Sequence, residues 1–125
     1  MRFAHCRKNH RIAGFCIEMP FELVHGAPFR NLSVEACFLY SCLLNAQALI
    51  NETDKKGYGF VLVTEEQLER LLRCQKKKAA RVLAELSDTA GLISVQKAAG
   101  KHLRVYVKNF ERPILPPNAR RKFGI

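Results

Sequence analysis

Residues 64–86, TEEQLERLLRCQKKKAARVLAEL, decide the fold of this chain. Thr64 precedes Gln67 by three positions. This is the spacing of a capping box, in which each of the two side chains bonds a free backbone N–H group at the start of a helix. Leucines then recur at helical spacing, which predicts a short helix with one buried face; they are Leu68, Leu71 and Leu72.

A second helix is predicted to begin at Gln75, because Arg73 and Cys74 interrupt the leucine pattern. Its apolar residues fall at i, i+3, i+4 and i+7 and so share one face; they are Ala79, Val82, Leu83 and Leu86. At about 100° per residue, the opposite face holds Lys77, Arg81 and Ala84, with Ala80 beside them and Lys76 and Lys78 at its flanks. Two short helices joined by a tight turn are typical of a helix-turn-helix, whose second helix lies in a DNA major groove.

The small residues Ala80 and Ala84 favour this interpretation, because they let the helix backbone approach base edges closely. A lysine-rich helix that faces only solvent is the simpler alternative, and the charge of the helix alone does not separate the two.

The basic residues are concentrated in the second part of the chain. Residues 1–69 carry 7 basic and 8 acidic side chains, whereas residues 70–125 carry 14 and 3. The net charge of the whole chain is +10, so the entire excess lies in residues 70–125. A segment this basic favours a polyanionic partner, most simply nucleic acid.

Composition and motifs limit the class of protein. At 125 residues and 48% hydrophobic content, the chain is expected to form one folded domain with a substantial core. It contains no P-loop, no glycine-rich phosphate cradle and no carboxylate or His/Cys arrangement at catalytic spacing. We therefore predict neither enzymatic activity nor a cofactor.

The cysteines and the hydropathy pattern predict a cytoplasmic protein without membrane contact. The 5 cysteines are an odd number without the spacing of a disulfide framework, which favours reduced thiols. Cys37 and Cys42 lie in an apolar helical pattern and are predicted as small core residues. Cys6 and His10 are zinc-ligand types, but the paired short spacings of a zinc site are missing, so no metal site is predicted. No apolar run reaches membrane-spanning length, and no signal-peptide core is present.

Several segments precede the helix-turn-helix. Residues 1–13 are polar and basic and predict a flexible arm. Residues 14–19 alternate between apolar and other side chains, which predicts a half-buried strand that ends at Pro20. A short helical turn or a loop is expected at 21–24. Ser33 is a good N-cap for an unusually apolar helix over 34–50, expected at the centre of the core, with a dimer contact as a second use of the same helix. A turn-rich loop at 51–59 and a short strand at 60–63 complete this part.

A basic hairpin follows the two helices. Gly91 is expected to have a positive φ at the helix exit. Strands are predicted at 92–95 and 103–108, with a turn between them. The tip and one face of this hairpin carry Lys97, Lys101, His102, Arg104 and Lys108. A basic hairpin in this position is a wing, which we expect to lie along the phosphate backbone. The predicted fold is thus α+β, a winged helix-turn-helix with a small antiparallel sheet over residues 14–110.

The end of the chain differs in composition. Residues 111–125 hold three prolines followed by Arg120, Arg121 and Lys122. This composition predicts a tail, or a linker to a second domain that lies outside this chain.

With these elements in order, the sequence resembles the N-terminal domain of RepA_N-type plasmid replication initiators over about residues 15–110. The resemblance rests on five pieces and on their order, namely FCIEMPFELV, LSVEACFLYSCLL, VLVTEEQLERLLRCQKKKAARVLAEL, GLI at 91–93 and VYVKNF at 105–110.

The resemblance implies a winged-helix domain that dimerises and binds repeated sites, called iterons, in a plasmid origin. It also implies a separate C-terminal domain that engages host replication proteins. Lys76, Lys77, Lys78 and Arg81 match the recognition helix, and residues 97–104 match the wing. Gln75 and Lys78 stand where relatives often have serine and threonine, so the resemblance does not extend to the base preference.

The resulting hypothesis is sequence-specific binding of duplex DNA. We expect Lys77 and Arg81 to contact base edges from the helix that Gln75 opens, and Lys76, Lys78, Lys97, Lys101 and Arg104 to contact phosphates. Two alternatives stay open. A transcriptional repressor of the same fold would protect a single palindrome rather than an array of repeats. A protein-interaction winged helix, similar to primosome components, would use the helix at 34–50 and would bind duplex DNA without salt dependence.

Overall fold

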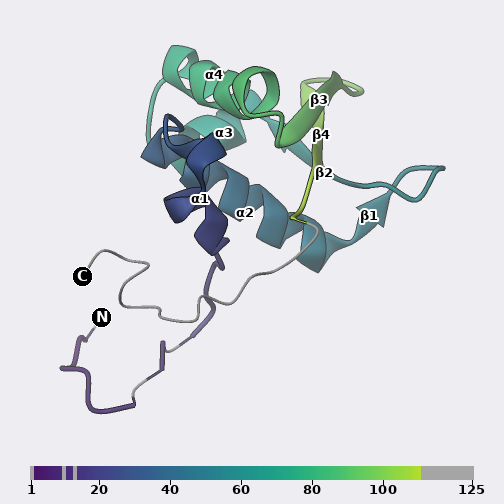
Figure 1. The fold of residues 1–125 in the computed structure, drawn as a ribbon. Helices are drawn as coiled ribbons and strands as arrows, with labels where there is room; N and C mark the ends of the chain where they lie inside the picture. Colours follow the sequence, from purple (N-terminus) through teal and green to yellow (C-terminus); the bar gives the residue numbers. More distant parts are fainter. Residues whose placement is uncertain (1, 10, 13, 111–125) are drawn as a thin grey trace.

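The computed structural model describes residues 2–9, 11–12 and 14–110 (Figure 1). Residues 1, 10 and 13 and the predicted tail at 111–125 lie outside the described residues, as does the candidate ligand His10. In chain order the helical elements are α1 (Phe21–His25), η1 (Ala27–Phe29), α2 (Val34–Ile50), α3 (Glu65–Leu72), α4 (Lys76–Ala84) and the π-helical turn η2 (Glu85–Thr89). The strands are β1 (Glu52–Thr53), β2 (Gly59–Thr64), β3 (Ile93–Lys97) and β4 (His102–Val107).

These elements form a winged helix, so the predicted α+β fold is confirmed. The strands make one antiparallel sheet in the order β1-β2-β4-β3. The helix-turn-helix, α3 and α4, lies between β2 and β3 in the chain, and α2 packs against β2, β4 and α4. Figure 1 shows α2, α3 and α4 gathered on one side and the β3–β4 wing beside α4. No helix in the described ranges is both long and apolar enough to cross a bilayer.

The capping box predicted at the start of α3 is present. The Thr64 N–H donates to Gln67 Oε1 at 2.9 Å, and the Gln67 N–H donates to Thr64 Oγ1 at 3.1 Å. The helix ends at Arg73, whose φ of +52° lies in the left-handed region. The Cys74 N–H bonds the Glu69 carbonyl across this residue at 3.1 Å. Arginine here occupies a conformation that glycine adopts with less strain.

The core forms where α2, α4 and the sheet meet. Leu39 and Tyr40 of α2, Leu86 of η2 and Val105 of β4 are all fully buried. The prediction that α2 is the central helix is confirmed, and its N-cap Ser33 accepts a hydrogen bond from the Ala36 N–H. Cys42 is buried as predicted and Cys37 is half-buried, and all 5 cysteines are free.

The strand predicted at residues 14–19 is absent, so that prediction is wrong. The backbone of Glu18 pairs instead with the side chain of Asn45 on α2, donating to Oδ1 at 3.1 Å and accepting from Nδ2 at 2.7 Å. One such pair does not make a ladder, and no strand of the sheet lies beside this segment. The alternating side chains therefore stay exposed, Phe15 by 79% and Ile17 by 48%.

The loop predicted at residues 51–59 contains a strand that the sequence analysis did not identify. β1 pairs with β2, with Glu52 opposite Phe60 and Thr53 opposite Gly59. Gly59 permits a close approach to α2, because a Cβ at this position would overlap the side chain of Gln47. Gly91 has the expected positive φ, +67°, and η2 extends the helical chain to Thr89 before it.

Tyr40 links the core to the end of the sheet and makes stability sensitive to alkaline pH. Its hydroxyl donates to the Lys108 carbonyl at 2.6 Å, and burial raises the pKa of Tyr40 from 10 to about 12. The unfolded chain therefore releases this proton first as the pH rises. We expect the free energy of unfolding to fall by up to about 3 kcal/mol between pH 10 and pH 12.

Urea unfolding at several pH values measures this loss. Tyr40→Phe is the matched variant, and its stability should vary less over the same interval, because its ring cannot ionise. Equal alkaline losses in the two proteins would contradict the assignment to Tyr40.

Candidate nucleic-acid interface

The outer face of α4 presents two cations. Ala79 and Val82 on the inner face are 3% and 2% exposed and hold the helix on the core. Lys77 and Arg81 are exposed, and within the described residues neither forms an ion pair. The exposure predicted for both side chains is thus confirmed. Two unpaired cations one helical turn apart can reach a polyanion or the acceptor atoms of base edges.

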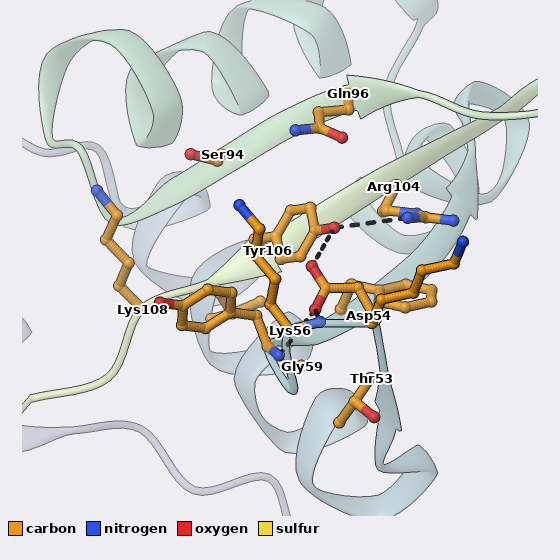
Figure 2. Close-up of a pocket in the computed structure, with 13 residues that line it drawn as sticks. Thr53, Asp54, Lys56, Gly59, Ser94, Gln96, Arg104, Tyr106 and Lys108 are labelled. Carbon is orange, nitrogen blue, oxygen red and sulfur yellow. Dashed lines mark hydrogen bonds between the residues drawn. The ribbon is translucent and has the colours of Figure 1, made fainter.

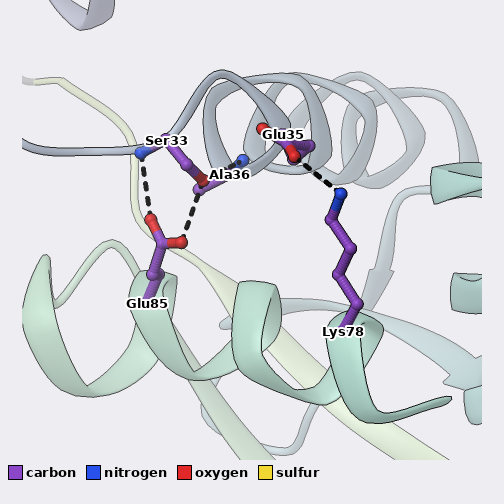
Figure 3. Close-up of polar contacts among 5 residues, drawn as sticks. All are labelled: Ser33, Glu35, Ala36, Lys78 and Glu85. Carbon is purple, nitrogen blue, oxygen red and sulfur yellow. Dashed lines mark hydrogen bonds and ion pairs between the residues drawn. The ribbon is translucent and has the colours of Figure 1, made fainter. Parts of the chain in front are cut away.

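The neighbouring lysines are directed at carboxylates of other helices. Lys76 Nζ lies 3.3 Å from Glu65 Oε2 at the start of α3. Lys78 Nζ lies 3.1 Å from Glu35 Oε2 on α2, as Figure 3 shows. The backbone N–H of Glu35 itself, then the hydrogen bond and charge of Lys78, and last the charge of Arg81 lower the pKa of the Glu35 carboxyl against a smaller opposing effect of burial. Exposed pairs of this kind contribute only about 0–1 kcal/mol, so a phosphate can replace either carboxylate at little cost.

Glu85 fixes the far end of the recognition helix. Its carboxylate accepts from the Ser33 N–H at 3.0 Å and from the Ser33 hydroxyl at 2.9 Å (Figure 3). Ser33 is the N-cap of α2, so the first turn of α2 and the segment that follows α4 are joined directly. This link ties the C-terminal end of α4 to the start of α2.

Gln75 is the N-cap of α4, as its predicted position requires. Its side chain is exposed and makes no capping hydrogen bond to the helix. The Gln75 side-chain amide is therefore available for other hydrogen bonds at the start of α4, next to Lys76.

A hollow of about 610 Å³, the wing hollow, lies between the wing tip and the starts of α3 and α4. It brings together Lys76 of α4 with Lys97 and Lys101 of the wing, three cations that the sequence analysis assigned to phosphates. Lys97 faces this side because it pairs with Leu103, which points toward the core side of the sheet. The wing and the recognition helix thus share one surface.

Sequence reasoning missed the acidic rim of the wing hollow. Glu65, Glu66 and Glu69 line the same hollow as the three lysines, and so does His102. The signal was present in the first turn of α3, where carboxylates favour the positive end of the helix dipole. These carboxylates make the α3 side of the wing hollow unfavourable for an anion.

Arg104 lies apart from the other predicted phosphate contacts. Its register partner is Leu62, which places it on the outer face of the sheet, away from the helices. Its guanidinium carbon lies 4.4 Å from the centroid of the Phe60 ring, and its Nη1 lies 3.5 Å from the Tyr106 hydroxyl. The wing cations therefore occupy two faces of the sheet instead of the single face that the sequence analysis assigned.

The described residues hold no group of three or more His, Cys, Asp or Glu side chains placed to bind a metal ion. Apart from the three glutamates on the α3 side of the wing hollow, the charged groups of the hollow and of the outer face of α4 are cationic donors. Such donors bind anions and acceptor atoms.

Comparison with solved structures identifies related folds. A structure described as "N-Terminal domain of DNA binding protein" aligns with a TM-score of 0.63 and 19% identity over 94% of each chain. A "Structure of Rep-DNA complex" aligns with a TM-score of 0.62 and 21% identity, covering 82% of this chain and 78% of the other. A "Structure of MDR initiator" aligns with a TM-score of 0.63 and 21% identity over 88% and 87%.

Among curated proteins, no sequence matches this chain. The family model of the replication initiator protein A (RepA) N-terminus does match, over residues 15–117. That match covers most of the chain, including the helix-turn-helix and the wing. The chain therefore belongs to the RepA_N family, the N-terminal region of replication initiator protein A.

Proposed function

We propose that this domain binds duplex DNA at repeated sites, or iterons, in a plasmid replication origin. In this proposal α4 enters the major groove, Lys77 and Arg81 contact base edges, and Gln75 assists at the start of the helix. Lys76, Lys97 and Lys101 contact the phosphate backbone, and Lys78 joins them when it leaves Glu35. Arg104 lies on another face and reaches phosphate only if the DNA extends around the wing.

The observation that carries this proposal is the direction of Lys77 and Arg81. Both are exposed on the face of α4 opposite Ala79 and Val82, without an ion pair in the described part of the chain. The wing hollow supports it, because wing and helix cations line one surface. The Rep–DNA complex of similar fold and the family assignment agree with DNA as the partner.

We also propose that the domain acts as a homodimer. Large apolar side chains are exposed on α2, where Val34 is 80% and Leu49 66% exposed, and on the segment before α1, where Phe15 and Ile17 are exposed. Monomeric proteins rarely leave extended apolar patches in water. These exposed side chains offer a second copy of this chain an apolar surface to cover.

Selection of bound duplexes from a random library, followed by footprinting on the selected sites, tests both parts. A dimer should protect half-sites whose centres lie about one helical turn, 10–10.5 bp, or a multiple of it apart. An array of direct repeats supports origin binding, whereas one palindrome would support a repressor. Binding without sequence preference or salt dependence would refute the proposal.

Lys101→Ala should weaken binding to all duplexes alike. Lys101 lies at the wing tip and is assigned to one phosphate, so its loss should reduce the slope of log K against log salt concentration by about 1. Fluorescence anisotropy over a salt series measures this slope.

Lys56→Ala is the matched control for charge, because Lys56 lies in the loop between β1 and β2, outside the wing hollow. Its slope should equal that of the parent protein. A changed base preference in Lys101→Ala would contradict the phosphate assignment.

A further inference from the structure

A second hollow lies on the outer face of the sheet, the face turned away from the helices. We call it the outer-face hollow; its volume is about 890 Å³ (Figure 2). Pockets of about 300–1,000 Å³ hold small organic ligands, so the space is adequate for a nucleotide unit. The interface proposed above for duplex DNA uses none of it except Arg104.

The outer-face hollow combines cations with aromatic rings. Lys55, Lys56, Arg104 and Lys108 line it, against one carboxylate, Asp54. Tyr58, 64% exposed, and Tyr106 provide rings on its surface, and Phe60 lies beneath Arg104. Ser94 and Gln96 of β3 lie on the same face and offer hydroxyl and amide groups (Figure 2).

The one carboxylate is fully engaged by the protein. Asp54 Oδ1 accepts from the N–H groups of Lys56 at 2.9 Å and Tyr58 at 3.0 Å, and Oδ2 accepts from the Tyr106 hydroxyl at 3.0 Å. Burial raises the pKa of Asp54, but these hydrogen bonds together with Arg104 outweigh it and lower the pKa below its ordinary value. Asp54 therefore shapes the loop and positions the Tyr106 ring, while the lysines remain free to bind an anion.

Basic side chains interleaved with exposed aromatic rings on a sheet are suited to unpaired nucleotides. The rings stack on bases, which are accessible only when the bases are unpaired, and the cations follow the phosphates. A duplex offers no base face to Tyr58. We propose that the outer-face hollow binds single-stranded DNA. The choice of DNA over RNA rests on the proposed function, whereas the choice of a single strand rests on the rings and charges.

The test is fluorescence anisotropy with a labelled thymidine oligonucleotide of about 12 nucleotides, within the usual site size of single-strand binders. We expect salt-dependent binding to the full chain. Because the chain has 3 tyrosines and no tryptophan, its tyrosine emission is readable directly, and stacking should quench it. Tyr58→Ala should weaken binding at least about fivefold and remove part of the quenching.

Matched variants distinguish this site from the recognition helix. Lys55→Ala/Lys56→Ala should weaken single-strand binding and leave duplex binding unchanged, whereas Lys77→Ala/Arg81→Ala should do the reverse. These four side chains are exposed, and circular dichroism verifies that each variant is folded. Failure of the duplex arm alone would count against the proposed function and not against this site.

Three results would overturn the proposal. The first is the absence of oligonucleotide binding, or binding that Tyr58→Ala leaves intact. The second is competition by random duplex as strong as by single strand, which would make the face a general phosphate surface. The third is tighter binding of a uridine ribonucleotide strand than of the thymidine strand, which would assign the face to RNA.

Discussion

Replacing Arg81 by alanine is expected to weaken binding of the selected duplex by about 1–3 kcal/mol and to relax specificity at one base pair. Arg81 lies one turn after Lys77 on the exposed face of α4. Its planar fork can donate two parallel hydrogen bonds to a guanine edge, a geometry that alanine cannot replace. Anisotropy with the selected site and with its single-base variants measures both effects.

Arg81→Lys is the informative control, because it keeps the charge and loses the fork. It should restore the affinity for random duplex but not the preference at that base pair. Unchanged binding of the selected site by Arg81→Ala would show that α4 does not read bases through this residue, and the proposed orientation of the helix in the groove would be wrong.

Leu86→Ala should have the largest effect on stability, a loss of about 2–5 kcal/mol in the free energy of unfolding. The Leu86 side chain is 0% exposed and packs in the core that α2, α4 and the sheet share. Alanine there removes buried methyl groups and leaves a cavity directly after the recognition helix. Urea unfolding followed by circular dichroism measures the change.

Val24→Ala is the matched control, since Val24 is 58% exposed on α1 and is not part of the proposed dimer contact. At equal protein concentration its effect should stay within about 0.5 kcal/mol, as for most surface substitutions. A loss below about 1 kcal/mol in Leu86→Ala would mean that η2 is not part of the cooperative core.

Local patterns in the sequence predicted the helix-turn-helix because its signals are local. The bonds between Thr64 and Gln67 span three residues, and the burial of Leu68, Val82 and Leu86 follows helical spacing. Leu71, predicted on the same buried face of α3, is instead 39% exposed. The same 100° projection placed Lys77 and Arg81 on the exposed face of α4. Each of these features depends on neighbours within a few turns of one helix.

The failures have distant causes. The alternation at residues 14–19 describes a strand, but the segment meets Asn45, 27 residues from Glu18, in place of a partner strand. The partners of Lys76 and Lys78 lie on other helices. No pattern along the chain specifies such contacts, because they depend on how finished elements pack.

The alternation along the predicted strand correctly placed Arg104 on the opposite face from Leu103 and Val105. What it could not show was which face of the sheet the recognition helix shares. That information comes from the packing of α2 and α4 on the side of Val105, which left Arg104 over Phe60 on the other side.

The hydrogen bonds between Glu85 and Ser33 imply that α4 is preorganised for the proposed binding of DNA. They hold the chain just beyond α4, while the buried side chains of Ala79 and Val82 hold the helix on the core. Ordering a side chain or a loop during association costs free energy that reduces affinity. In the proposed complex α4 is already ordered in the folded domain, so binding of a cognate duplex loses less free energy to ordering of the helix.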